Sequence, residues 1–342
     1  MIRIWFNHWF STVYEIIRLI KKDNSKFYII GTNHNIYSPV RNVCDEWYEE
    51  PVLAADEYVD FCLSFCRDHG VDIFIPRQHM LAISQNKKRF ETLGVKVMVD
   101  KYDLIAPLND KQAAYQLIDK YGIADVPPYK IATTKKEFLD GYHELLQNNY
   151  RVCFKFVHDE GGQSFHLIDN DKKRYHQLFY RHSTHISLKD TLQALSERDK
   201  FSPIILMPYL SGEEVSVDCL NTQFGIIMIP RFKNFTRIEE IRYDSTIISA
   251  VKKIFEFMPL ENPCDIQFKY LNGIPYFLEV NTRMSGGIQL SCLASKINIP
   301  IVAIYKLLGI NKKWYNDYNS RKVSYIEKPL LINEKEQKDD KK

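Results

Sequence analysis

The stretch that decides the fold is Cys264-Asp-Ile-Gln-Phe-Lys-Tyr-Leu-Asn-Gly-Ile-Pro-Tyr-Phe-Leu-Glu-Val-Asn-Thr-Arg-Met-Ser-Gly-Gly287. In its middle, Asn272-Gly273 separates two apolar runs, and this dipeptide is a strong signal for a two-residue hairpin turn. The two runs are therefore predicted to pair as antiparallel strands. This pairing would bring Gln267, on the first strand, beside Glu279 on the second.

The polar side chains of this hairpin are expected to share one face. Residues two apart in a strand point to the same side, so Glu279, Asn281 and Arg283 would project together if the extended conformation persists. The amides of Gln267 and Asn281 and the carboxylate of Glu279 offer hard oxygen ligands of the kind that Mg²⁺ accepts. Arg283 would add a fixed cation for phosphate oxygens. Taken alone, the pattern fits an exposed strand face without a ligand equally well.

Several motifs in a fixed order resemble those of a known family. Phe277-Leu-Glu-Val-Asn-Thr-Arg283 resembles the metal-binding strand of the ATP-grasp superfamily, in the branch of biotin carboxylase and the carbamoyl-phosphate synthetase large subunit. Met207 to Asp218 resembles the hinge and ribose-contact segment of those enzymes, and Asp159 to Ser164 resembles their glycine-rich flap. Lys111 and Lys155 stand where the family places its two ATP-contacting basic residues.

The resemblance implies ATP and Mg²⁺ as cofactors, with Mn²⁺ as an alternative metal. It assigns ATP contacts to Lys111, Lys155, Gly161, Gly162, Gln163, Pro208, Tyr209, Leu210 and Glu214, the last one to the ribose, with Glu213 as the less favoured alternative. It assigns the metal to Gln267, Glu279 and Asn281, and charge neutralisation on the transferring phosphoryl group to Arg283 and Arg231. Met207 replaces the hinge carboxylate of many relatives, which leaves adenine to be read by main-chain atoms.

Residues 1–106 alternate strand-like and helix-like segments. Such alternation indicates a parallel sheet with helices on both faces. The loop at 7–11 has no glycine-rich fingerprint, so an NAD site is not expected there. Arg41, Arg77 and His79 lie in or after predicted loops at strand ends, where α/β folds tend to bind ligands. The predicted strands are Ile2 to Phe6, Phe27 to Gly31, Val71 to Pro76 and Val95 to Val99, with a helix at about 55–69.

The rest of the chain is predicted to form a second, largely antiparallel sheet. Its strands are expected at 204–210, 215–220, 224–232, 266–270 and 276–280. The fold class is therefore α/β plus α+β, and the resemblance implies an ATP-grasp fold behind a doubly wound parallel-sheet domain. The expected organisation is an N-terminal Rossmann-like domain at 1–106, a first ATP-grasp subdomain with lid and flap at 107–205, a C-terminal subdomain with the metal and nucleotide site at 206–325, and a charged tail at 326–342.

Composition excludes several classes of protein. The 342 residues carry 46 Lys plus Arg against 43 Asp plus Glu, a net charge of +3 without clustered basic runs. That balance gives no electrostatic basis for binding nucleic acid. The apolar start at 1–10 is short and is followed by charged residues, so neither a signal peptide nor a membrane span is expected. Seven scattered cysteines argue against a disulfide framework. We expect a cytoplasmic protein.

The expected activity is that of an ATP- and Mg²⁺-dependent ligase. It would phosphorylate a substrate carboxylate and let an amine, or less often a thiol, displace the phosphate from the acyl phosphate. Its partners would be small-molecule carboxylate and amine substrates, and a homodimer is compatible with the resemblance. Two alternatives stay open on sequence grounds: phosphate transfer to a non-carboxylate acceptor, and nucleotide binding without catalysis.

Overall fold

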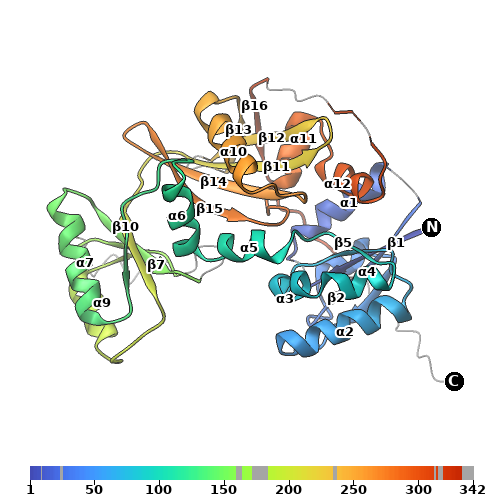
Figure 1. Ribbon diagram of the computed structural model, residues 1–342, viewed down its shortest axis with the longest axis horizontal. Helices are drawn as coiled ribbons and strands as arrows, with labels where there is room; N and C mark the ends of the chain where they lie inside the picture. The colour runs from blue at the N-terminus through green and yellow to red at the C-terminus, as the bar shows by residue number, and fades with distance from the viewer. Residues whose placement is uncertain are drawn as a thin grey trace. The chain divides into compact units, whose positions relative to one another are not determined.

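The computed structural model describes residues 1–8, 10–23, 26–158, 164–171, 184–233, 237–311, 313–314 and 319–332 (Figure 1). The chain divides into two compact units, each built from segments distant in sequence. Unit 1 comprises Met1–Ala106, Val215–Ile266 and Val280–Lys342, and unit 2 comprises Pro107–Glu214 and Gln267–Glu279. The predicted division into domains at 106, 205 and 325 stays a prediction. The predicted tail lies outside the described residues from 333 onward.

Unit 1 begins with the parallel sheet that the sequence predicts. All four strand pairs are parallel, and the strand order is β3-β2-β1-β4-β5, which confirms the doubly wound arrangement. One strand was not foreseen: Glu46-Trp-Tyr-Glu49 lacks the apolar run by which the others are recognised. The strands are β1 (Ile2–Asn7), β2 (Phe27–Asn33), β3 (Glu46–Glu49), β4 (Ile73–Ile75) and β5 (Lys96–Val97).

Alternation along β1 explains why helices cover both faces of this sheet. Ile4 and Phe6 point into the same apolar cluster as α1 (Val13–Asp23). Trp5 points to the opposite face, where its ring lies 4.5 Å from that of Phe65 in α2 (Ala55–Asp68) and stacks at 4.1 Å on Phe74. The remaining helices of this region are the 3-10 helix η1 (Pro39–Val43), α3 (Met80–Gln85), α4 (Lys87–Thr92) and α5 (Tyr102–Leu108).

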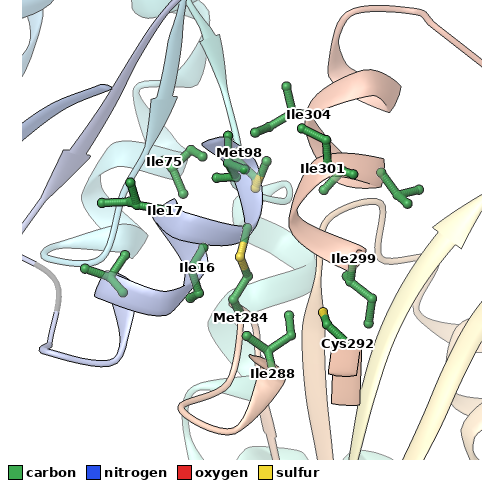
Figure 2. Close-up of a cluster of buried hydrophobic side chains, with 14 of the residues drawn as sticks. Ile16, Ile17, Ile75, Met98, Met284, Ile288, Cys292, Ile299, Ile301 and Ile304 are labelled. Atoms are coloured by element: carbon green, nitrogen blue, oxygen red, sulfur yellow. The ribbon is translucent and has the colours of Figure 1, made fainter. Parts of the chain in front are cut away.

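The core of unit 1 joins its first and last segments. Ile16 and Ile17 of α1 pack with Ile288 and Cys292 of α11 (Ile288–Ser295) and with α12 (Ile299–Leu307) (Figure 2). Both late helices bury most of their side chains, which explains their apolar composition. Among the described residues no single helix is long and apolar enough to cross a membrane, although α11 and α12, bent by 97°, would pass that test as a pair.

A six-stranded sheet contains the polar hairpin of residues 264–281. Its order is β15-β14-β11-β12-β13-β16. Helix α10 (Ser245–Phe257) contacts β12, and its first turn is capped by the side chain of Asp244. The strands are β11 (Glu214–Thr222), β12 (Gly225–Lys233), β13 (Ile238–Ile241), β14 (Cys264–Leu271), β15 (Ile274–Asn281) and β16 (Arg321–Ser324).

Unit 2 contains a third sheet, which corrects one prediction. Residues 204–210 were expected in the same sheet as the strands after 215, but β10 pairs antiparallel with β6 and β7. Helices α7 (Lys135–Gln147), which starts with a complete capping box at Thr134, and α9 (Leu188–Leu195) contact each other and pack beside it (Figure 1). The strands, in sheet order, are β6 (Lys130–Ala132), β10 (Ile204–Pro208), β7 (Val152–Phe156), β8 (His166–Ile168) and β9 (His185–Ile186), and α6 covers Lys111–Lys120.

Candidate functional site

The hairpin of β14 and β15 turns at the dipeptide that predicted it. Asn272 has φ 52° and Gly273 has φ 81°, so both central residues are left-handed, as a type I′ turn requires. The two strands are neighbours in the sheet, which confirms the predicted pairing. The extended conformation ends at Asn281, however, and not at Arg283. Arg283 lies on the bend that follows, and its guanidinium donates to the carbonyl of Met284 at 3.5 Å.

Side-chain contacts join the two strands of the hairpin. The ring of Phe268 lies edge-to-face with that of Phe277 at 6.1 Å, directly opposite when counted from the turn. Farther along, Asn281 Nδ2 donates to Asp265 Oδ2 at 3.4 Å, which is one residue out of that count. The position of Gln267 beside Glu279 stays a prediction, and so does the metal set.

Within unit 2, helix α6 brings a lysine to the hairpin carboxylate. Lys111 is 8% exposed, and its Nζ lies 3.8 Å from Glu279 Oε2 and 3.3 Å from the carbonyl of Val157. One turn later on the same helix face, the ring of Tyr115 contacts that of Phe277. Burial raises the pKa of the Tyr115 hydroxyl, and the nearby Glu279 carboxylate adds to the increase. The predicted phosphate-contacting lysine and metal-ligating glutamate are therefore neighbours.

The predicted hinge packs in an apolar cluster next to β7. Leu210 is buried there, and Tyr209 lies partly buried against it, together with Leu278 of β15. The thiol of Cys153 lies 3.5 Å from the carbonyl oxygen of Met207 and 3.6 Å from that of Pro208. Burial raises the pKa of this thiol to about 12, so it is a neutral donor toward those carbonyls at neutral pH.

Charged side chains lie near this apolar cluster. Lys155 follows Cys153 by two residues on β7 and is half-buried, so both side chains lie on the same face of that strand. The carboxylate of Glu214 lies 3.7 Å from Nζ of Lys269 on β14, whereas the neighbouring Glu213 is exposed. Sequence reasoning missed Lys269. Its signal was available, because it stands two residues after Gln267 on a strand and so shares its face.

The predicted flap is the part of the site whose geometry is not described. Gly161, Gly162 and Gln163 lie outside the described residues. The described structure resumes at Ser164, whose hydroxyl accepts from the backbone N–H of Phe156 at 2.9 Å. The flap assignment therefore stays a prediction from its sequence.

Arg231 of unit 1 occupies a closed network of charges. It is 2% exposed, pairs with Glu239, and lies 3.5 Å from Asp218 Oδ2. The two Asp218 oxygens also accept from Ser285 and Ser291, each at 2.6 Å. Burial alone would lower the pKa of Arg231, but the carboxylates of Asp218, Glu239 and Asp265 outweigh it and raise that pKa. In this structure the guanidinium faces protein carboxylates.

The hairpin supplies the donor types that a hard cation needs. A carboxylate from Glu279 with amide oxygens from Asn281 and Gln267 fits the oxygen-only ligand preference of Mg²⁺, which retains several water or phosphate ligands. Among the described residues there is no group of three or more His, Cys, Asp or Glu that could hold a metal by itself. A metal at the hairpin would therefore depend on amide oxygens and on oxygens brought by a second ligand.

Comparison with known proteins identifies the class to which this fold and site correspond. Residues 200–329 match the family model described as "ATP-grasp in the biosynthetic pathway with Ter operon", and residues 11–98 match the model "PylC-like, N-terminal domain". Two separate parts of the chain are therefore similar to an ATP-grasp family and to a PylC-like N-terminal family. This confirms the resemblance found in its motifs.

Individual relatives agree with that class. The carbamoyl phosphate synthase large chain of Clostridium botulinum (strain Kyoto / Type A2) is 23% identical over 310 residues, which are 86% of this chain but only 27% of that protein. The biotin carboxylase domain of Hydrogenobacter thermophilus 2-oxoglutarate carboxylase, in complex with MgADP, ADP and bicarbonate, superposes with TM-score 0.66 at 16% identity and covers 92% of this chain and 71% of its own. N5-carboxyaminoimidazole synthetase from Staphylococcus aureus, complexed with ADP, gives TM-score 0.67 at 15% identity, with 91% and 78% covered. These structures share the fold.

Proposed function

We propose that this chain is an ATP- and Mg²⁺-dependent ligase that activates a substrate carboxylate as an acyl phosphate for attack by an amine, with a thiol as the alternative nucleophile. The observation that carries the proposal is the 3.8 Å approach of Lys111 Nζ to Glu279 Oε2. A nearly buried lysine beside a partly exposed carboxylate suits a site where phosphate oxygens and a divalent cation would complete the charge balance.

Different residues of unit 2 would bind the base, the ribose and the phosphates of a nucleotide. The apolar cluster around Leu210 and Leu278 offers surfaces for a flat base, and main-chain atoms of the hinge 207–210 would read its edge. Glu214 would bind the ribose hydroxyls, with its carboxylate oriented by the neighbouring Lys269. Lys111 and Lys155 would bind phosphate oxygens as fixed cations.

Activation of a carboxylate needs negative charge to be stabilised while a phosphoryl group moves. Glu279 and Asn281, with Gln267, would hold Mg²⁺, and Mn²⁺ is the alternative occupant. When bound, the metal would supply Lewis-acid stabilisation of phosphate oxygens. Arg283, on the bend after β15, would neutralise charge on the transferring group. Arg231 is proposed to support that bend, because its buried guanidinium contacts Ser285 at 3.3 Å.

An acyl phosphate trap tests the proposal directly. The full chain would be incubated with ATP, Mg²⁺ and hydroxylamine over a library of small acids and amino acids, with ADP and hydroxamate measured together. We expect both products for at least one acid, and their loss in Glu279→Gln. Glu144→Gln, which removes an exposed carboxylate of α7 in the same unit, is the matched control and should retain both.

The trap also separates the alternatives. ADP release without hydroxamate, with a phosphorylated acceptor, would replace the ligase with a phosphotransferase. The absence of ADP release with every acid, or an unchanged rate in Glu279→Gln, would overturn the proposal. We further propose that the partners are small molecules rather than nucleic acid or membrane, that the protein acts in the cytoplasm, and that a homodimer is its assembly, in line with the dimer of the Hydrogenobacter domain.

A further inference from the structure

A second group of polar side chains lies at one edge of the N-terminal parallel sheet in unit 1. Strands β1, β2 and β3 are followed directly by His8, His34 and Glu50, and β4 is followed two residues later by Arg77. These strands are adjacent in the order β3-β2-β1-β4, with parallel pairing throughout. Their carboxyl ends therefore share one edge, and the order of successive strands reverses between β1 and β4, where open α/β sheets commonly bind ligands.

Glu50 is a buried carboxylate at this edge, and hydrogen bonds hold it in place. It is 2% exposed and accepts three hydrogen bonds: from the Tyr58 hydroxyl at 2.5 Å, from Thr32 Oγ1 at 2.7 Å and from the His8 backbone N–H at 3.0 Å. Tyr58 in turn accepts from Asn7 Nδ2 at 2.7 Å. Burial raises the pKa of Glu50, while these hydrogen bonds lower it. The carboxylate is therefore held in place and satisfied by protein.

His8 and His34 form a stacked pair next to Glu50. Their ring centroids lie 4.3 Å apart at an interplanar angle of 27°, and the two Nδ1 atoms are 2.9 Å apart. His8 Nδ1 also lies 4.0 Å from Glu50 Oε1. A hydrogen bond between two imidazole nitrogens needs one donor and one acceptor, so this arrangement requires at least one neutral ring. His34 is exposed and can meet a ligand.

Cationic groups face His8 from the neighbouring elements. Burial lowers the pKa of His8, and His34, Arg77 and His79 lower it further through their charges. The backbone N–H of Arg77 donates to Asn7 Oδ1 at 2.6 Å, which fixes the start of this loop. His79 lies against the ring of Tyr58 at 5.0 Å. A bound anion would act against these cations, because it would favour the protonated form of the His8 ring.

Exposed apolar side chains border the same edge. Phe10, after β1, is 55% exposed, and the guanidinium carbon of Arg77 lies 4.6 Å from its ring centroid. Tyr37, after β2, is 61% exposed. Large aromatic side chains beside cationic groups suit a ligand that combines a negative charge with an apolar body.

We propose that His8, His34 and Arg77 form a binding site for an organic anion, a carboxylate or phosphate ester with an apolar body, and that the histidine pair takes up a proton when the anion binds. The site lies within the N-terminal sheet of unit 1, so the proposal does not rest on the ligase function. A metal on the two imidazoles is disfavoured, because the described residues contain no group of three metal-binding side chains here or elsewhere.

Proton uptake on binding makes the affinity for the anion depend on pH. If the bound anion raises the pKa of the histidine pair, affinity rises as the pH falls through the pKa of the complex, and it becomes constant below the lower pKa of the free protein. Each unit of difference between the two pKa values corresponds to a tenfold change in affinity. We expect a gain of about tenfold on going from about pH 8 to about pH 5.5.

Histidine-detected NMR of the full chain tests this with three probes that share a phenyl ring. Sodium benzoate represents a carboxylate, phenyl phosphate a phosphate ester, and benzyl alcohol an uncharged control. We expect one or both anions to shift the signals of His8 and His34 saturably at constant ionic strength, with tighter binding at lower pH. The preferred anion distinguishes the two ligand sources. Benzyl alcohol should bind much more weakly.

Variants assign the effect to the site. His34→Ala changes an exposed residue, so the fold should persist while the pH dependence of affinity is lost. Arg77→Gln should weaken anion binding by about tenfold or more. His143→Ala, an exposed histidine of α7, is the matched control and should change neither quantity. No saturable shift with either anion, equal binding of benzyl alcohol, or an unaltered pH dependence in His34→Ala would overturn the proposal.

Discussion

Two ion-pair groups of this molecule each place a buried cation beside a carboxylate, and they differ in how much of the carboxylate is exposed. In unit 1, Arg231 is 2% exposed and meets two carboxylates and a serine hydroxyl. In unit 2, Lys111 is nearly as buried, but its carboxylate partner Glu279 is 3.8 Å away and 26% exposed at the side chain. The first group pairs its charges within the protein, although Nε of Arg231 has no hydrogen-bond partner among the described residues. The second leaves a carboxylate facing outward, where a ligand can approach.

This difference suggests a structural role for the first group and a ligand-binding role for the second. A closed network stabilises the positions of the elements that supply it, here β11, β12, β13 and the loop before α11. A half-open pair, whose carboxylate is partly exposed, can be reached by a ligand, which is typical of groups kept for binding or catalysis. The comparison predicts opposite responses when the cation of each group is removed.

The largest effect is expected from Arg231→Met. This change leaves the carboxylates of Asp218 and Glu239 buried without their cation, so the free energy of unfolding should fall by about 3–5 kcal/mol. Urea denaturation followed by circular dichroism measures it. Arg237→Met, which breaks the exposed pair with Glu327, is the control and should cost less than about 1 kcal/mol. Equal costs for both variants would show that the network is not closed.

Lys111→Met should reverse that balance. It replaces a nearly buried cation by an apolar side chain of similar size and leaves Glu279 partly in water, so stability should change little or rise. ADP release should nevertheless fall by about 10²–10³-fold, the usual loss when one fixed group that stabilises developing charge is removed. Lys120→Met, an exposed lysine of the same helix, is the control. Loss of stability without loss of turnover would assign Lys111 to the core instead.

The contact of the closed network with the loop before α11 can be tested by adding one carbon. A methyl group on Gly287 would collide with the guanidinium of Arg231, whereas a methyl group on Gly286 would meet its nearest atom, in Thr12, at 3.8 Å. Gly287→Ala should therefore cost about 1–3 kcal/mol in the free energy of unfolding, as overpacked sites do. Gly286→Ala should be close to neutral in the same assay. Similar values for the two would remove Arg231 from contact with this loop.

Short-range signals predicted much of this structure. The apolar run Ile2 to Phe6 and the dipeptide Asn272-Gly273 each determine local conformation through adjacent residues, and both predictions are confirmed. Glu46–Glu49 was missed because its pattern is polar and aromatic, and it becomes a strand only by pairing with β2. The placement of 204–210 was wrong for the same reason, because strand partners are chosen by tertiary packing.

The environments of the charged residues could not be predicted in this way. The partners of Arg231 are Asp218, Glu239 and Ser285. These residues lie on different segments of the chain, and no local sequence pattern links them to Arg231. The pair of His8 with His34 likewise depends on two strands lying side by side. The sequence identifies which residues can carry charge, and packing decides which of them are closed off.

The smallest effect is expected at the second half-open pair, Lys269 with Glu214. Their atoms are 3.7 Å apart and both side chains are about a quarter to a third exposed, so the pair itself contributes little to stability. Lys269→Met should raise the KM for ATP by about threefold, because Glu214 loses a neighbour that orients it toward the ribose, while kcat stays constant. Lys136→Met, an exposed lysine of α7, is the control for loss of charge. A fall in kcat at unchanged KM would move Lys269 from nucleotide binding to the phosphoryl transfer step, and the contrast between closed and half-open pairs would then extend to a third group.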